Sequence, residues 1–351
     1  VGALSTTGVR ALSVSQVVAL TSLQASVLTT AQIGVLTTVE VAAMETNDLR
    51  ALTTVQAAVL ASNQISVLSV DQVGALTSYQ IAVLGTASLR GLGSTQVAAL
   101  NSAQVQALTT AQVASLTVAQ VAAIEVPDVA SLTTQQLVAL TTQQVVGLSV
   151  DQIAGLTSGQ VSNLTTSQVA ALTSTQIVAV ETTDLRALTT TQVAALTSSQ
   201  VGALSLEQVG VLTTQQVPNL SVSAVRALAV DRVAVLSSAQ VFSLTTLQVS
   251  SLGTAQVAAV ETTDLQALST SQIVALGTAQ VAALTVDQVA ALTTAQALNL
   301  LTAQVAAMGV GQVAAMETAD LSVLTTNQIG VLSSAQIAGL TDGQVASLTT
   351  V

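Results

Sequence analysis

Apolar and polar residues recur in blocks of eight along the whole chain, from Val1 to Val351, with no insertion or deletion. One clear copy is Leu188-Thr-Thr-Thr-Gln-Val-Ala-Ala, and Leu196 begins the next. With Val1 taken as position one, position four occurs at 44 places and is Leu at 38 of them. Position five is Ser or Thr at 30 of 44 places, and position eight is Gln at 33 of 43. Such periodicity predicts a repeat architecture in which each unit packs on its neighbours.

Positions five to eight of each octad carry the signal for the start of a helix. A Ser or Thr followed three residues later by Gln forms a capping box, in which each side chain bonds the backbone amide of the other residue. The apolar residues at positions four and one flank this box and form a hydrophobic staple. Each octad therefore predicts about two turns of helix followed by a bend. We predict an all-α solenoid of about 44 eight-residue helical repeats.

Two other backbone arrangements can be weighed against this solenoid. In one continuous α-helix, eight residues at about 100° each would rotate the apolar stripe by about 80° from one octad to the next. This rotation excludes a single continuous helix. A β-solenoid remains the alternative, because Val and Thr favour strands and an even period keeps each position on one face. Against it, the apolar residues at positions one to four do not alternate, and no position is consistently a turn residue. We therefore favour the helical solenoid.

A second type of octad, here called the acid unit, has Glu at position five and Asp at position eight. In it the preceding Leu is also replaced by Met, Ile or Val. Successive acid units are ten, seven, ten and seven octads apart, so the pattern repeats every 17 octads. Either a 136-residue block was duplicated, or 17 octads complete seven, five or three turns and bring the acid units to one face. The pairs are Glu45 and Asp48, Glu125 and Asp128, Glu181 and Asp184, Glu261 and Asp264, and Glu317 and Asp320.

The composition narrows the class of protein. Half of the residues are hydrophobic but only 1% are aromatic and 7% charged, which suits thin layers of small aliphatic side chains. We expect one continuous solenoid over residues 1–351 with no linker. The chain has no His and no Cys, which removes most transition-metal sites and nucleophile–base pairs, so we expect neither an enzyme nor a small-molecule substrate. A net charge of −11 argues against nucleic acid, and no apolar run is long enough to span a membrane.

The ten carboxylates of the acid units are the candidate metal ligands of the sequence. Calcium binds six to eight oxygen ligands, so one Glu-x-x-Asp pair would need hydroxyl or carbonyl oxygens from adjacent turns. The competing explanation is structural. Acidic residues near helix N-termini are favoured by the helix dipole, and Arg50 and Arg186 would partly neutralise them. No other cofactor is expected.

The motif Leu-Thr-Thr-x-Gln-Val-x-Ala-Leu resembles the low-complexity octapeptide tracts of very long bacterial secreted and surface proteins. The resemblance covers the whole chain and is compositional, so it transfers no functional residue. It implies a structural or adhesive role in an extracellular or cell-surface location.

We expect a structural protein that forms or belongs to an elongated extracellular filament or stalk. No octad at either end looks like a polar capping repeat, so we expect end-to-end stacking with other copies of the chain. The alternatives are a calcium-responsive adhesin or surface binding module and, ranked lower, an ice-binding protein. The Thr residues at positions five and six point in different directions on a helix or a strand, so they do not form one flat array.

Overall fold

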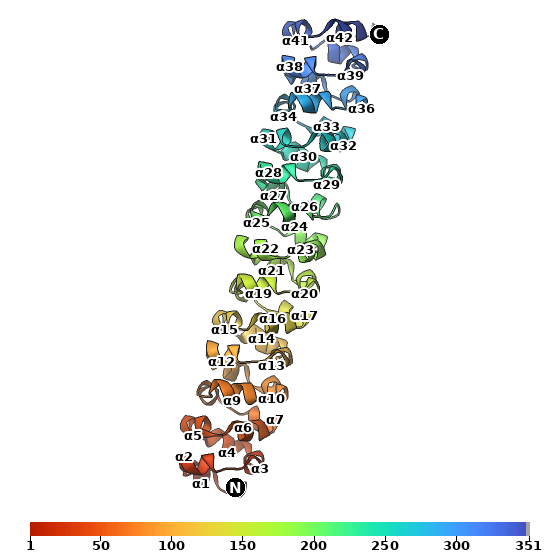
Figure 1. The fold of residues 1–351 in the computed structure, drawn as a ribbon. Coiled ribbons are helices and arrows are strands. Elements are labelled where there is room, and N and C mark those ends of the chain that lie inside the picture. The colour runs from red at the N-terminus through yellow and green to blue at the C-terminus, as the bar shows by residue number, and fades with distance from the viewer. Residues whose placement is uncertain (349–351) are drawn as a thin grey trace. The chain divides into compact units, whose positions relative to one another are not determined.

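The computed structural model describes residues 1–348, which form 42 short α-helices and one 3-10 helix (Figure 1). These residues contain no strand, so the all-α prediction is confirmed and the β-solenoid alternative is wrong. The chain divides into two compact units, Val1–Val180 and Glu181–Val351. The octad register of the sequence runs through this boundary without interruption, and the single solenoid over residues 1–351 stays a prediction.

The first unit contains the helices α1 to α22, which are four to six residues long. Their bounds are α1 Thr6–Arg10, α2 Val14–Val18, α3 Ser22–Ser26, α4 Thr30–Val35, α5 Thr38–Ala43, α6 Thr46–Ala51, α7 Thr54–Ala57, α8 Ser62–Ser66, α9 Val70–Ala75, α10 Ser78–Val83, α11 Thr86–Leu89, α12 Ser94–Ala98, α13 Ser102–Ala107, α14 Thr110–Ser115, α15 Val118–Ala122, α16 Val126–Ser131, α17 Thr134–Ala139, α18 Thr142–Val146, α19 Val150–Ala154, α20 Ser158–Asn163, α21 Thr166–Ala171 and α22 Ser174–Ala179.

The second unit contains the helices α23 to α42 and the 3-10 helix η1 within its described part, which ends at residue 348. Their bounds are α23 Thr182–Ala187, α24 Thr190–Ala194, α25 Ser198–Ala203, α26 Leu206–Gly210, η1 Val217–Asn219, α27 Val222–Ala227, α28 Val230–Ala234, α29 Ser238–Ser243, α30 Thr246–Ser251, α31 Thr254–Ala258, α32 Thr262–Ala267, α33 Thr270–Ala275, α34 Thr278–Ala282, α35 Val286–Ala290, α36 Thr294–Leu298, α37 Thr302–Ala307, α38 Val310–Ala314, α39 Thr318–Ser322, α40 Thr326–Ile329, α41 Ser334–Ala338 and α42 Asp342–Ser347.

The predicted capping box starts most of these helices, and α14 shows its geometry. The hydroxyl of Thr109 accepts from the backbone amide of Gln112 at 3.2 Å, and the backbone amide of Thr109 donates to Oε1 of Gln112 at 2.7 Å. Both Thr109 and Leu116, which ends the helix, have extended backbones, with ψ of 157° and 147°. The box therefore begins most of the helices, and in octads like that of α14 the extended Leu and Thr between two helices make the bend.

The interior of each unit is filled by positions one and four. Val113 and Leu116, for example, are buried, and the same holds for almost every octad away from residues 1–24 and 329–348. Burial of a Val or Leu side chain stabilises a fold by roughly 1.5–3 kcal/mol. A helix of five residues has no stability of its own, so it is held in place by the neighbouring octads that cover these side chains.

Within each unit, every helix packs on the helix three octads further along the chain. Thus α14 packs on α17 and α17 on α20 in the first unit, and α30 packs on α33 in the second. Hydrogen bonds between successive turns join residues 25 to 31 apart. Five turns in 136 residues would need about 27 residues a turn, which lies in this range, whereas seven turns (about 19) and three turns (about 45) do not. The geometry thus supports the explanation in which 17 octads complete five turns, and duplication of a 136-residue block stays open.

The two prolines have different effects on their octads. Pro127 lies in the first turn of α16, where the amide that it lacks would have no intrahelical partner. Pro218 lies in the body of its octad, where a short 3-10 helix replaces the α-helix. Proline removes a backbone donor and clashes with the preceding turn, which explains the change.

The interior of the second unit contains a narrow void of about 20 Å³ that is lined only by Val and Leu side chains, Val260 among them. A void lined only by apolar side chains is expected to stay dry, because a buried water needs polar partners. None of the described helices has both the length and the apolar character needed to cross a membrane.

Candidate functional site

The recurring polar feature of the structure is a glutamine side chain that links each turn to the turn before it. In the octad of Gln168, Oε1 accepts from the backbone amide of Thr165 at 2.9 Å, as the capping box requires. Its Nε2 donates to the carbonyl oxygens of Leu137 and Leu140, at 2.9 and 2.8 Å. These carbonyls lie 31 and 28 residues earlier in the chain. One buried side chain therefore both starts its own helix and holds the preceding turn.

The bond to the position-four carbonyl of the preceding turn recurs through both units. The last carbonyls of a helix have no partner within that helix, and the position-four carbonyl lies just beyond it. A buried carbonyl without a donor costs free energy, so the Gln amide supplies the missing bond. In the first unit the donors are Gln32, Gln56, Gln64, Gln72, Gln80, Gln96, Gln104, Gln112, Gln120, Gln136, Gln144, Gln152, Gln160, Gln168 and Gln176. In the second they include Gln216, Gln240, Gln248, Gln256, Gln272, Gln280, Gln288, Gln296, Gln304, Gln312, Gln328, Gln336 and Gln344.

The capping box predicts only half of this role. It explains why Gln accepts a hydrogen bond from the cap residue but not why it donates one to the preceding turn. A capping box accepts Glu as readily as Gln. Glu stands at position eight once, at Glu40, whereas Gln stands there at 33 of 43 places. This preference for the amide was the signal that position eight must also donate a hydrogen bond.

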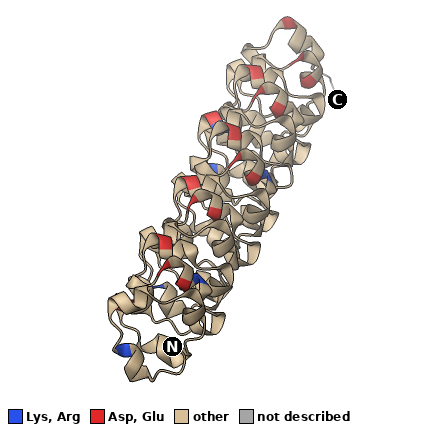
Figure 2. Cartoon of the chain, turned by 60° about the horizontal axis from the view of Figure 1, so that its bottom comes forward, with Lys and Arg blue, Asp and Glu red and all other residues tan. Residues whose placement is uncertain are grey.

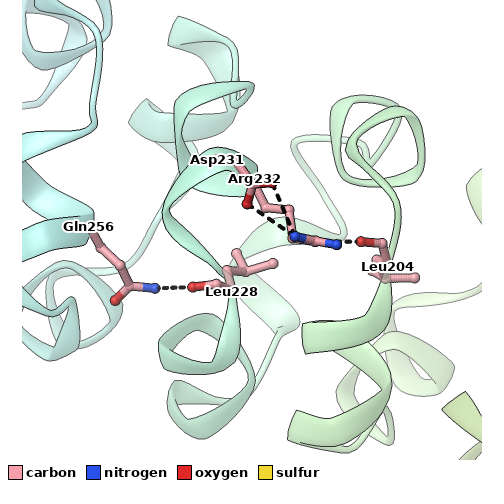
Figure 3. A network of polar contacts seen from close by, with 5 residues as sticks. All are labelled: Leu204, Leu228, Asp231, Arg232 and Gln256. Carbon is pink, nitrogen blue, oxygen red and sulfur yellow. Dashed lines mark hydrogen bonds and ion pairs between the residues drawn. The ribbon is translucent and has the colours of Figure 1, made fainter.

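Two other residue types at position eight perform the same bridging function. The hydroxyl of Ser88 donates to the carbonyl of Leu60 at 2.6 Å, again 28 residues earlier. In the second unit, Nε of Arg232 donates to the carbonyl of Leu204 at 2.7 Å, and the guanidinium also pairs with Asp231 at 3.0 Å (Figure 3). The figure shows the ordinary bond from Gln256 to Leu228 beside it. At these two octads the position-four carbonyl thus finds a donor although Gln is absent.

Arg232 offers a direct test of this bridging function. We expect Arg232→Gln to leave the stability nearly unchanged, because the amide restores the usual donor to Leu204. Arg232→Ala should cost about 1–3 kcal/mol, because it leaves that carbonyl without a partner. The free energy of unfolding of both variants, measured in urea, checks the order. Equal losses for Gln and Ala would show instead that the ion pair with Asp231 carries the effect.

The acid units break the bridging pattern, as Asp48 shows. Its Oδ1 accepts from the hydroxyl of Ser22 at 2.9 Å, but its Oδ2 is buried and has no hydrogen-bond partner. The residue as a whole is only 2% exposed. The position-four carbonyl that a Gln at this place would bond, that of Leu20, receives no hydrogen bond from any residue that the structure describes. Glu45 begins α6 without a side-chain cap bond.

Two further acid units share the contact with a hydroxyl one turn earlier. Ser102 donates to Asp128, and Ser238 donates to Asp264. The pKa of Asp320 is raised above its ordinary value, chiefly because the carboxyl is buried. The nearby charge of Glu317 raises it further, and the polar side chain of Thr294 offsets part of the rise. Oδ2 of Asp320, like that of Asp48, is buried and unpartnered. In the remaining unit, Glu181 begins α23 without a side-chain cap bond and Asp184 is buried.

Each acid unit is followed one turn later by another acid, so that the acids form groups of three. Fifteen of the 17 acidic residues belong to these groups, all except Glu40 and Asp231. Within each unit of the fold, the groups recur along one side of the ribbon (Figure 2). The Glu members and the added acids are exposed, whereas the Asp members are buried. Among residues 1–348, no three acidic side chains lie close enough together to hold a metal ion by themselves. The added acids are Asp71, Asp151, Glu207, Asp287 and Asp342.

The arginines that were expected to neutralise these acids do not pair with them. Within residues 1–348, the guanidinium groups of Arg50 and Arg186 form no ion pair. Arg50 instead lines an open hollow of about 360 Å³ together with Ser78 and Asn101. The Ser78 hydroxyl and the Asn101 amide nitrogen also have no hydrogen-bond partner in the described structure.

Comparison with known families places the octads in a longer repeat. Six segments match the ALTTAQ repeat, and together they cover almost two thirds of the chain. Five of the six segments begin with the octad of an acid unit, so each acid unit has the same place in its segment. No curated protein shows a significant match to the chain. The matched segments are residues 41–78, 81–118, 121–158, 177–214, 257–294 and 313–350.

Proposed function

The chain belongs to the ALTTAQ repeat family, and we propose that it is a structural repeat protein rather than an enzyme. The observation that carries this proposal is the Gln bridge, which repeats the same turn-to-turn contact in octad after octad. Position-eight side chains hold successive turns of the backbone together, and the buried hydrophobic side chains are almost all aliphatic. The chain also has no His, Cys or Lys to act as a base or nucleophile.

We further propose that the protein forms or belongs to an extracellular filament or stalk and that its partners are other copies of itself. A turn offers Gln amides on one face and position-four carbonyls on the other, as Gln168 and Leu140 show. Two such faces are complementary, so one copy can stack on another as one turn stacks on the next. Head-to-tail contacts of this kind build an open filament unless the rotation closes a ring.

Electron microscopy of the purified protein in negative stain tests the filament proposal. We expect fibres whose length grows with protein concentration, with sedimentation velocity showing the same growth in solution. Exposed Leu247, which is 65% accessible, gives a matched control. Leu247→Ser should leave the fibres unchanged, because it alters the side surface and not the turn faces. Particles of uniform length at every concentration would contradict self-assembly, and loss of fibres in Leu247→Ser would contradict stacking through the turn faces.

A further inference from the structure

We propose that the acid units whose Asp carboxylate is buried and unpartnered bind a divalent cation of the calcium type. The sites with this feature are those of Asp48 and Asp320. The cation would lie where an ordinary octad places the amide nitrogen of Gln.

The ordinary octads show what the acid units lack. In them the Gln amide nitrogen lies close to two carbonyl oxygens of the preceding turn, at 2.9 and 2.8 Å for Gln168. Aspartate is one methylene shorter than Gln and, when ionised, can only accept hydrogen bonds. At Asp48 a carboxylate therefore stands at position eight instead of a donor. Its Oδ1 contacts Ser22 of the preceding turn, and its Oδ2 is buried without a partner. A buried charge with no partner is costly, and a bound cation would remove this cost.

The oxygens available at Asp48 suit a hard cation. They are its own Oδ2, the hydroxyl oxygen of Ser22, and the carbonyl oxygens of Leu20 and Val17. Leu20 and Val17 occupy the places that Leu140 and Leu137 have relative to Gln168. Ser22 gives its proton to Oδ1 of Asp48 and keeps its lone pairs. Calcium binds carboxylate, carbonyl and hydroxyl oxygens together with water in a flexible geometry, whereas magnesium requires a stricter octahedron. At Asp320 the residues at the same offsets in the chain are Thr294, Leu292 and Val289.

The exposed acids near these sites would attract cations to them. Glu45 lies just before Asp48 at the start of α6. Asp71 lies 26 residues after Glu45, which is the same separation as that between Ser22 and Asp48. Their charges raise the local concentration of cations without having to bind the ion directly. A site with one buried carboxylate is weak, and we expect a Kd of about 10⁻⁴–10⁻³ M, as in extracellular calcium modules.

Hydrogen exchange of the full chain at constant pH and ionic strength tests the proposal. With about 10 mM calcium and a Kd of about 1 mM, the amides of α6 and α39 should open about tenfold less often than in chelator. The ordinary octad of α18 should not respond. Asp48→Gln restores the usual amide bridge, so it should abolish the response at α6 and leave that at α39 intact.

Each other result would overturn the proposal. Unchanged exchange at α6 and α39 in calcium would show that no ion binds there. A response spread over all octads, or one that survives in Asp48→Gln, would show general screening of the exposed acids. An equal response to magnesium would remove the assignment to calcium. None of these readings depends on whether copies of the chain assemble.

Discussion

Gln168→Glu is expected to destabilise the first unit by about 3–5 kcal/mol, the cost of a buried charge without a partner. The substitution keeps the size of the side chain and its acceptor for the backbone amide of Thr165. It removes the donor to Leu137 and Leu140 and places a negative charge against their carbonyl oxygens. Glu should therefore be worse than Ala, which only leaves polar groups unpaired at about 1–3 kcal/mol. Urea unfolding followed by circular dichroism measures both variants.

A matched control lies in the octad of α18, where Gln143 is exposed. Gln143→Glu adds the same charge to a surface position in the first turn of a helix, so its effect should stay within about 0.5 kcal/mol. If Gln168→Glu were as mild as Gln143→Glu, the contacts between turns would not depend on the amide donor. The capping box alone would then explain the Gln at position eight.

Much of the local structure could be predicted because each octad carries its own helix signal. Thr109 and Gln112 form the expected box, Pro127 lies in the first turn of its helix, and Pro218 disrupts its octad. These features depend on residues within one octad, which periodicity and capping rules describe directly. The helical solenoid followed from the same signals, because helices this short need neighbours to bury their Val and Leu.

The arrangement of turns could not be predicted from the octad alone. A bend between two helices has an angle that no capping rule fixes, so seven, five and three turns per 17 octads were all open. The contact from Ser22 to Asp48 and the bond from Gln168 to Leu140 settle the separation between neighbouring turns. They also give the acid units their environment, with Asp inside and Glu outside, which a sequence pattern of two carboxylates does not distinguish.

The acid units now have a physical description that their sequence only suggested. In the described part of the chain Arg50 forms no ion pair with these acids, while the hydroxyl of Ser22 one turn earlier donates a hydrogen bond to Asp48. Whether calcium binds at any of the ten predicted ligands stays a prediction. No three acids converge in residues 1–348, so the site that we propose uses further oxygens from the preceding turn.

Leu140→Ala should cost about 2–5 kcal/mol, because Leu140 is buried at 3% exposure and its loss leaves a cavity that the short helices fill only in part. Its carbonyl would still receive the bond from Gln168, so the change isolates the apolar contribution of position four. In a repeat protein each unit couples chiefly to its neighbours, and damage should stay local. Hydrogen exchange should rise in α17 and α18 and in the helices α14 and α20 that pack on α17.

The extent of this opening decides how the octads cooperate. Amides of α5 and α6, several turns away in the same unit, should keep their protection if turns are coupled only to adjacent turns. Leu247→Ala, at a position that is 65% exposed, should change neither stability nor exchange and so controls for the loss of a Leu as such. Loss of protection throughout the first unit in Leu140→Ala would show that it unfolds as one cooperative body. The Gln bridges would then transmit damage through the unit instead of confining it to adjacent turns.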